Sequence, residues 1–166
     1  TKGGDITLEG FNVTLPAGSR LDASGGVAVT ERNKYAYGDA GSITIRAGQD
    51  PTYKSVLGGQ LKLLGELRGF SGATGGTLAI KAPAIVIADR LDFDSANLVN
   101  KFANVGALVL KPEFFSQGGF TQFNLTGIGG PVDTIDPLDL DAPTPYLPAV
   151  FIAPGTFLEP QVQGLA

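Results

Sequence analysis

Apolar and polar residues alternate along many short segments of the chain, and most of these segments begin with glycine. The clearest case is residues 75–88, in which two glycines precede apolar residues at every second position. Because successive side chains of a strand point to opposite faces, this pattern predicts a half-buried strand. Pro83 has no N–H to donate, so it predicts a corner, after which Ile85 and Ile87 begin a second short strand.

The same unit recurs as a glycine followed by apolar residues two and four positions later. It begins at Gly4, Gly41, Gly59, Gly76 and Gly106, and the steps from Gly41 to Gly59 to Gly76 are about 18 and 17 residues. Steps of this size are typical of solenoid repeats. Residues 12–15 and 20–23 predict two further strands in the first repeat. Three short strands for each turn of roughly 20 residues indicate a parallel β-helix of about six or seven coils.

Stacking of these coils buries rows of apolar side chains that a single coil leaves exposed. We expect inward-pointing side chains at Ile43, Ile45, Leu61, Leu63, Leu78, Ile80, Leu108 and Leu110. We expect outward-pointing side chains at Ser42, Thr44, Lys62, Thr77 and Lys81. A β-sandwich also has short alternating strands, but its hairpins favour Asn-Gly or Asp-Gly turns, and neither dipeptide occurs here.

Three segments interrupt the repeats. Residues 30–39 form a polar loop with tyrosines, residues 94–105 a short helix that ends at Gly106, and residues 131–148 a proline- and aspartate-rich surface excursion. The aromatic segment at 113–126 lacks a clean period of two, so we expect a bend near Phe123. Regular strands resume at residues 150–152 and 156–158. The whole chain, residues 1–166, is expected to be one β-helical segment of a longer protein.

The composition excludes several function classes. The chain has 24 glycines and 11 prolines, 17% charged residues and a net charge of −4, with no basic cluster, so nucleic acid is not an expected partner. It contains no cysteine and no histidine. Disulfides and thiolate chemistry are therefore excluded, and the side chain best suited to proton transfer near neutral pH is missing. No run of residues is long and apolar enough for a membrane helix.

Two groups of acidic residues are candidate sites. The first is the group Asp89, Arg90, Asp92 and Asp94. Two carboxylates can act as acid and base on a sugar, but acidic residues in front of a predicted helix are expected as caps, which is the interpretation we favour. The second group is Asp133, Asp136, Asp139 and Asp141. It offers oxygen ligands for calcium but lacks the glycine-spaced pattern of a calcium loop, so a solvated loop is expected. No metal, cofactor or catalytic residue is predicted.

Aromatic residues are the remaining candidates. Phenylalanines are more often core than sugar-stacking platforms, so we expect core packing for Phe114, Phe115, Phe120 and Phe123. Tyr35, Tyr37 and Tyr53 lie in polar loops, where an amphipathic ring suits binding, and they are the candidate surface contacts.

Several segments together resemble one protein family. They are Gly-Asp-Ile-Thr-Leu (4–8), Pro-Ala-Gly-Ser-Arg-Leu-Asp-Ala-Ser-Gly-Gly (16–26), Gly-Ser-Ile-Thr-Ile (41–45), Leu-Gly-Glu-Leu-Arg-Gly-Phe (64–70), Gly-Gly-Thr-Leu-Ala-Ile (75–80) and Phe-Phe-Ser-Gln-Gly-Gly-Phe-Thr-Gln-Phe-Asn-Leu-Thr-Gly (114–127). The series resembles the repetitive shaft of large bacterial exoproteins of the filamentous haemagglutinin type. This resemblance implies a right-handed parallel β-helix and secretion through an outer-membrane two-partner transporter. It also implies a role at the bacterial cell surface in adhesion, biofilm formation or contact-dependent competition.

The sequence thus predicts a structural and adhesive segment without catalysis, whose partners are host or neighbouring-cell surfaces, glycans included. One alternative is a filament subunit whose open coils stack head to tail, because both ends of the predicted solenoid lack polar caps. A second alternative is a polysaccharide-acting β-helix enzyme, which needs ionisable groups clustered on one face.

Overall fold

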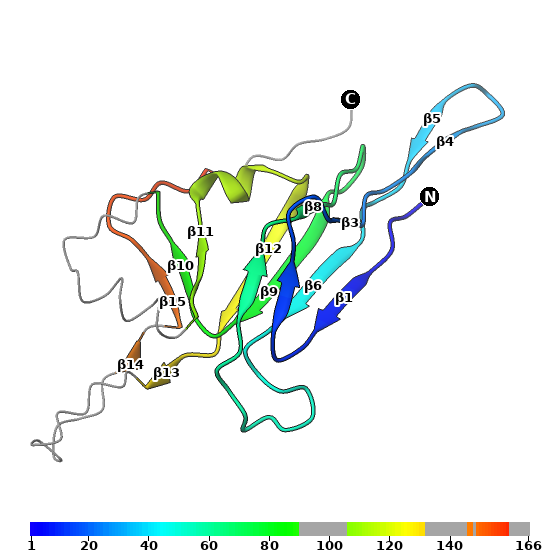
Figure 1. Cartoon of the computed structure of the whole chain (residues 1–166). Helices are drawn as coiled ribbons and strands as arrows, with labels where there is room; N and C mark the ends of the chain where they lie inside the picture. The colour runs from blue at the N-terminus through cyan, green and yellow to red at the C-terminus, as the bar shows by residue number, and fades with distance from the viewer. Residues whose placement is uncertain (90–105, 132–145, 148, 160–166) are drawn as a thin grey trace, which may run out of the picture.

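The computed structural model describes residues 1–89, 106–131, 146–147 and 149–159 (Figure 1). Nearly all of the regular structure in these residues is β-strand. In chain order the elements are β1 (Ile6–Glu9), β2 (Val13–Leu15), β3 (Arg20–Asp22), β4 (Val27–Val29), β5 (Tyr35–Tyr37), β6 (Ser42–Arg46), β7 (Leu61–Leu63), β8 (Glu66–Arg68), β9 (Gly76–Ala82), β10 (Ile85–Ile87), β11 (Leu108–Leu110), the 3-10 helix η1 (Pro112–Ser116), β12 (Phe120–Gly127), β13 (Gly130–Pro131), β14 (Tyr146–Leu147) and β15 (Val150–Ile152). The described part of the chain is therefore all-β.

The largest sheet contains four parallel strands in the order β1-β6-β9-β12. Its register matches alternating positions of the repeats, so that Ile6, Ile43, Leu78 and Phe123 form one row across the sheet. A second row runs through Leu8, Ile45, Ile80 and Leu125. The glycine-led segments thus pair as the alternation predicts, with apolar residues of successive strands side by side.

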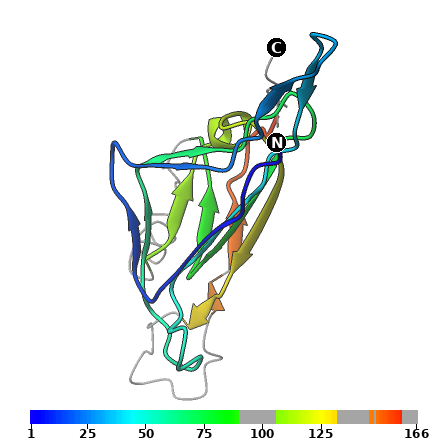
Figure 2. The same cartoon turned by 90° about the vertical axis from the view of Figure 1, so that its right-hand side faces the viewer.

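The other parallel pairs are shorter. β10 lies between β11 and β15, β2 pairs with β7, and β3 pairs with β8. The first three strands of the chain therefore each have a parallel partner one layer further along: β1 with β6, β2 with β7 and β3 with β8. We call β1–β3 the first layer and β6–β8 the second layer. Turned by 90°, the molecule shows the four-stranded sheet on one side and β10, β11 and β15 on the other (Figure 2).

One apolar core joins these sheets. Ile43, Ile45, Leu78 and Ile80 from the four-stranded sheet are buried together with Leu61, Ile85, Leu108 and Leu110 from the opposite strands. Burial of each such side chain contributes roughly 1.5–3 kcal/mol. The predicted inward residues are confirmed as core, except that Leu63 is only half-buried and packs against the core edge. The predicted outward residues are all more exposed than their inward neighbours.

The spacing between layers differs from the prediction. Partners across the four-stranded sheet are separated by 37, 35 and 45 residues. The segment that begins at Gly59 pairs with Val13–Leu15 rather than with the segment at Gly76. The glycine-led pattern marks the start of a strand in any sheet, so the 17- to 18-residue steps join different sheets. The prediction of six or seven coils is therefore wrong for the described residues, in which the deepest sheet has four strands.

Other local predictions had mixed outcomes. Within the predicted loop at 30–39, residues 30–34 form the turn of an antiparallel hairpin, and residues 35–37 form its second strand, β5, which pairs with β4. The 3-10 helix η1 was not predicted. It begins at Pro112, and its residue Phe115 is buried in the core. β12 continues past Phe123 without a break, and its irregularity lies between Phe120 and Gln122.

At the C-terminal side, residues 156–158 form no strand, although Leu158 packs against the core. The predicted helix at 94–105 lies outside the described residues. The predicted excursion at 131–148 also lies mostly outside them, apart from the β13–β14 pairing.

Close approach between layers explains why two of the repeat glycines are needed. A Cβ on Gly41 would collide with the carbonyl oxygen of Gly4, and a Cβ on Gly59 would collide with that of Phe11. Neither glycine has a positive φ. The requirement is therefore one of space between stacked strands and not of backbone conformation.

Candidate contact surface

The β4–β5 hairpin carries the most exposed cluster of apolar and aromatic side chains in the described residues. Its antiparallel register places Val27 opposite Tyr37 and Val29 opposite Tyr35. Residues two apart share a face, so these four side chains lie on one face of the hairpin. Tyr35 is 69% exposed and Tyr37 is 40% exposed, and their ring centroids lie 6.5 Å apart. We call this group the hairpin patch; both views show the hairpin projecting beyond the sheets (Figures 1 and 2).

The base of the hairpin is fixed to the body of the protein. The N–H of Gly26 donates to the carbonyl oxygen of Thr1, and the Oγ–H of Ser71 donates to that of Gly38, each at 2.8 Å. The Tyr37 ring lies directly over Gly72, where no Cβ would fit. A two-stranded hairpin is marginally stable alone. These contacts hold the hairpin patch in one orientation relative to the sheets.

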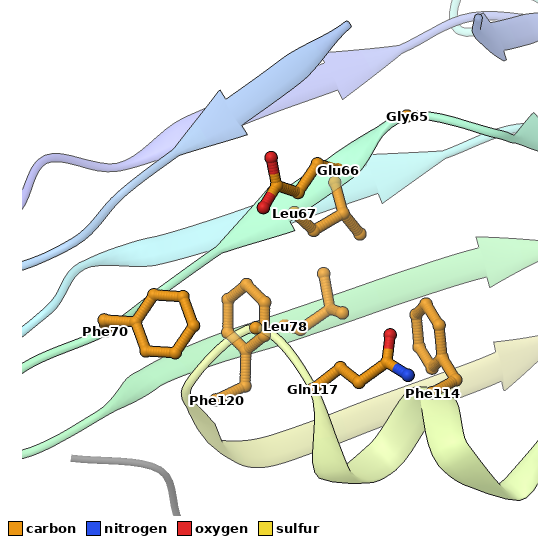
Figure 3. Close-up of a pocket in the computed structure, with 9 residues that line it drawn as sticks. Gly65, Glu66, Leu67, Phe70, Leu78, Phe114, Gln117 and Phe120 are labelled. Carbon is orange, nitrogen blue, oxygen red and sulfur yellow. The ribbon is translucent and has the colours of Figure 1, made fainter. Parts of the chain in front are cut away.

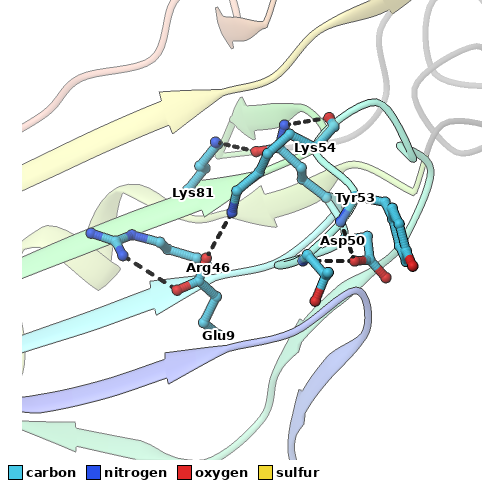
Figure 4. A network of polar contacts seen from close by, with 8 residues as sticks. Glu9, Arg46, Asp50, Tyr53, Lys54 and Lys81 are labelled. Carbon is cyan, nitrogen blue, oxygen red and sulfur yellow. Dashed lines mark hydrogen bonds and ion pairs between the residues drawn. The ribbon is translucent and has the colours of Figure 1, made fainter.

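Tyr53, the third candidate contact, lies elsewhere. It is 68% exposed on the loop between β6 and β7, where the Asp50 carboxylate accepts hydrogen bonds from the N–H groups of Thr52 and Tyr53 (Figure 4). Both bonds lower the pKa of Asp50, and the bond from Tyr53 has the larger effect. The hairpin precedes β6 and this loop follows it, so the tyrosines lie at opposite ends of the strand. The structure therefore pairs Tyr35 with Tyr37 and does not bring Tyr53 to them.

The 47–58 loop is held by polar contacts to the outer face of the four-stranded sheet. The Glu9 carboxylate lies 3.5 Å from Arg46 Nη1 and 3.5 Å from Lys54 Nζ, and Lys81 Nζ donates to Gln49 Oε1 at 2.7 Å (Figure 4). These groups are largely solvent-exposed, so each ion pair is weak. The network positions a loop and forms no enclosed site.

Opposite charges alternate along each of the strands β3 and β8 and also face each other across the pair. The register places Arg20 opposite Glu66 and Asp22 opposite Arg68. Glu66 accepts hydrogen bonds from Arg68 Nε at 2.7 Å and from Arg20 Nε at 2.9 Å, which lower its pKa, with that of Arg68 having the larger effect. Hydrogen bonding from Ser24 lowers the pKa of Asp22. Each charge thus faces an opposite one, which fixes the register of the two strands.

A cavity of about 170 Å³ separates β8 from the segment after η1 (Figure 3). Its lining is mainly apolar and comes from Leu67, Phe70, Leu78, Phe114 and Phe120, with Glu66 and Gln117 contributing polar groups. Ligand sites usually enclose about 300–1,000 Å³. The size of this cavity is that of a packing gap where η1 replaces a third strand beside β8.

The phenylalanines belong to the core, as predicted. Phe115 and Phe120 are buried, and Phe123 lies edge-on to both, at 5.1 and 6.1 Å between ring centroids. Such tilted pairs add to the stabilisation from buried area. They are not available as a sugar-stacking platform.

The acidic candidate sites lie mostly outside the described residues. Asp89 is exposed, whereas Arg90, Asp92, Asp94 and the four aspartates from Asp133 to Asp141 are not described. Within residues 1–89, 106–131, 146–147 and 149–159, no three acidic side chains come together as a metal site. Over the same residues, no helix has the length and apolar character needed to span a membrane.

Val27 and Val29 belong to the hairpin patch but were not among the predicted contacts. The signal was present in the sequence, because Val-Ala-Val and Tyr-Ala-Tyr alternate on either side of a five-residue polar turn. The turn is closed by the N–H of Lys34, which donates to Thr30 Oγ1, and by Asn33 with φ of 52°.

Comparisons of the chain with protein-family models, curated proteins and solved structures found no match.

Proposed function

We propose that the chain is a structural and adhesive segment of a secreted bacterial surface protein, built as a right-handed parallel β-helix and without catalytic activity. The observation that carries the proposal is the stacking of layers. All three strands of the first layer pair in parallel with the three successive strands of the second layer. Parallel crossover connections are right-handed in about 98% of cases.

Burial supports the same proposal. In both core rows of the four-stranded sheet, the two central residues are fully buried and the two outer ones are only half-buried. Stability in such a stack comes from neighbouring layers rather than from a closed core. A rigid shaft that displays projecting loops is what this arrangement supports best. Secretion through a two-partner transporter is part of the proposal by resemblance alone.

The hairpin patch is the proposed adhesive contact, because it combines exposed aromatic area with a fixed orientation. Tyr side chains are enriched at binding surfaces, since the ring is apolar and the hydroxyl at its end is polar. We expect particles coated with the chain to be retained on bacterial or host cell layers. The double variant Tyr35→Ser, Tyr37→Ser is expected to lose most of this retention.

The matched control is Tyr53→Ser, which changes an equally exposed tyrosine at the other end of β6 and is expected to retain binding. Equal retention by the double variant and the unmodified chain would remove the hairpin patch from the proposal. Turnover of a polysaccharide that is lost in Asp92→Asn or Asp94→Asn would contradict the absence of catalysis.

A head-to-tail filament of identical chains is the second candidate, favoured by the half-buried apolar residues of the edge strands β1 and β12. The absence of cysteine makes a clean test available. In a stack that continues the register, Thr7 of one copy lies beside Asn124 of another. A chain carrying Thr7→Cys and Asn124→Cys should then form disulfide-linked multimers on oxidation. The control pair Thr7→Cys, Gln122→Cys is displaced by two residues and should link less.

A further inference from the structure

The first layer presents one strand edge that lacks a partner within the described residues. Each of β1, β2 and β3 pairs on one side only, with β6, β7 or β8. Its inward side chains Ile6, Leu8, Val13 and Leu21 are half-buried and pack at the margin of the core. We call this surface the first-layer face.

Gly4 lies on the first-layer face and has no structural reason of its own to be glycine. It aligns with Gly41 and Gly76, which follow it across the sheet. A Cβ on Gly41 would collide with the Gly4 carbonyl oxygen, and a Cβ on Gly76 would lie 2.8 Å from that of Gly41. A Cβ on Gly4 would meet nothing within 4 Å, and its φ is not positive. A further strand stacked on β1 would place a carbonyl at Gly4 and would require this glycine.

The contacts between the first and second layers show which polar groups such a strand needs. Asp5 Oδ1 accepts the N–H and Oγ–H of Ser42, at 2.9 and 2.7 Å, and Asn12 Oδ1 accepts the N–H of Gln60 at 2.9 Å. The first layer thus supplies side-chain acceptors to the backbone of the second layer. In the same way, a layer stacked on the first-layer face would supply side-chain acceptors to the backbone N–H groups of Asp5 and Asn12.

The charges on the first-layer face define the partner more narrowly. Glu9 faces Arg46, Arg20 faces Glu66, and Asp22 faces Arg68. On the free side, the same complementarity calls for a basic residue opposite Glu9. It also calls for an acidic and a basic residue, two positions apart, opposite Arg20 and Asp22. Like charges directly opposite are generally destabilising. The next pair in the row of Glu9 is Arg46 with Lys81, so the pattern is taken from the contact between the first and second layers alone.

Accordingly, we propose that the first-layer face binds another parallel layer of second-layer type, with apolar pairs over Ile6 and Leu8 and the charge pattern just described. This inference rests on the proposed β-helical shaft. A second copy of this chain does not supply the pattern. Its opposite edge strand, β12, carries Thr126 in the row of Glu9. Beyond β8, moreover, the chain continues the stack with the segment after η1, whose Gly118 carbonyl accepts the Gly69 N–H, and not with a charged strand.

The test adds such a layer to the full chain by placing a copy of residues 40–72 ahead of Thr1. Residues 1–3 align with residues 73–75, so the junction repeats the native connection. The N–H of Gly10 already donates to Arg46, so the alternating N–H groups of Thr7 and Glu9 point to the free edge. Amide hydrogen exchange of Thr7 and Glu9 is expected to slow by roughly tenfold or more relative to the unmodified chain. Exchanging the charges of the added copy alone, with Glu66→Arg and Arg68→Glu, keeps its composition and is expected to remove much of this slowing.

Gly4→Ala provides the second arm. It should leave the unfolding midpoint of the unmodified chain unchanged, and it should abolish the slowing in the extended chain. Unchanged exchange in the extended chain, with β6 and β9 still protected, would overturn the inference and leave the proposed shaft intact. Rapid exchange throughout β6 and β9 of the unmodified chain would instead count against the shaft itself. Concentration-dependent association of the unmodified chain that Gly4→Ala abolishes would identify a second copy as the occupant and overturn the choice of partner.

Discussion

The β4–β5 hairpin and the β6 strand that follows it both have alternating side chains but opposite environments. In β6, Ser-Ile-Thr-Ile alternates polar and apolar residues, and in the hairpin Val-Ala-Val and Tyr-Ala-Tyr alternate large and small side chains. Only the β6 segment was predicted as a strand. In the structure Ile45 is 0% exposed and Val29 is 63% exposed. Both segments are strands, so alternation determines the local conformation. Burial depends on whether another layer lies on each side.

The largest expected effect concerns the core row of β6. Ile45→Ala should destabilise the protein by about 2–5 kcal/mol, because it leaves a cavity between fully buried neighbours. Val29→Ala in the hairpin should change the free energy of unfolding by about 0.5 kcal/mol or less. Chemical denaturation monitored by circular dichroism measures both. Equal losses would show that the hairpin packs as the stack does.

A smaller effect is expected from the space between layers. Gly59→Ala should destabilise by about 1–3 kcal/mol, since its Cβ would overlap the Phe11 carbonyl of the first layer. Ala28→Val adds more volume to the exposed hairpin and should remain within about 0.5 kcal/mol of the unmodified chain. The comparison is read from thermal unfolding midpoints. A tolerated Gly59→Ala would mean that β2 and β7 can separate without loss.

Charge pairs between layers should contribute still less. Glu66→Gln removes the negative charge between Arg20 and Arg68 and one of the two oxygens that accept from them, and we expect a small loss of stability that shrinks as salt is added. Glu31→Gln in the hairpin turn is the control, because no ion pair to Glu31 is found in the described part of the chain. Unfolding midpoints at low and high salt make the test. A salt-independent loss at Glu66 would indicate that the lost hydrogen-bond acceptor matters more than the lost charge.

The smallest effect is a dependence on pH. Hydrogen bonds from the Oγ–H and the N–H of Ser42 lower the pKa of Asp5 below its ordinary value of 3.8. The folded state therefore favours the carboxylate, and this stabilisation is present above about pH 3.8 and is lost as the pH falls through the folded pKa. Asp5→Asn should flatten this acid limb in titrations of stability from about pH 5 to about pH 2. Ser42→Ala, which removes one of the two donors, should give an intermediate slope.

Much of the local structure could be predicted from the sequence. The alternating residues of β1, β6, β7, β9 and β11 gave the correct strands and a nearly correct core, because a period of two is a property of the strand itself. The spacing between layers could not be read from the same pattern. Strands of different sheets, such as β6, β7 and β11, begin with the same glycine-led pattern, so the sequence does not show which of these segments are neighbours.

The composition of the hairpin patch was predicted in part. Tyr35 and Tyr37 are exposed as expected, but their pairing with Val27 and Val29 depends on the hairpin register, which fixes the face that each side chain occupies. The sequence does not show that Tyr53 lies apart from Tyr35 and Tyr37. Their separation follows from the position of β6 between the hairpin and the 47–58 loop, which puts Tyr53 at the opposite end of that strand. The special position of Gly4 was also hidden, because it depends on the space around one Cβ.

The unequal separations between paired residues bear on how the chain tolerates insertions. Neighbours in the four-stranded sheet are 35 residues apart at one step and 45 at the next, yet the rows remain aligned. Loop-closure entropy grows only logarithmically, so this difference costs about 0.2 kcal/mol. Length can therefore be added or removed at the corners between strands at little thermodynamic penalty. Selection can change what the loops display while the rows that they connect stay the same.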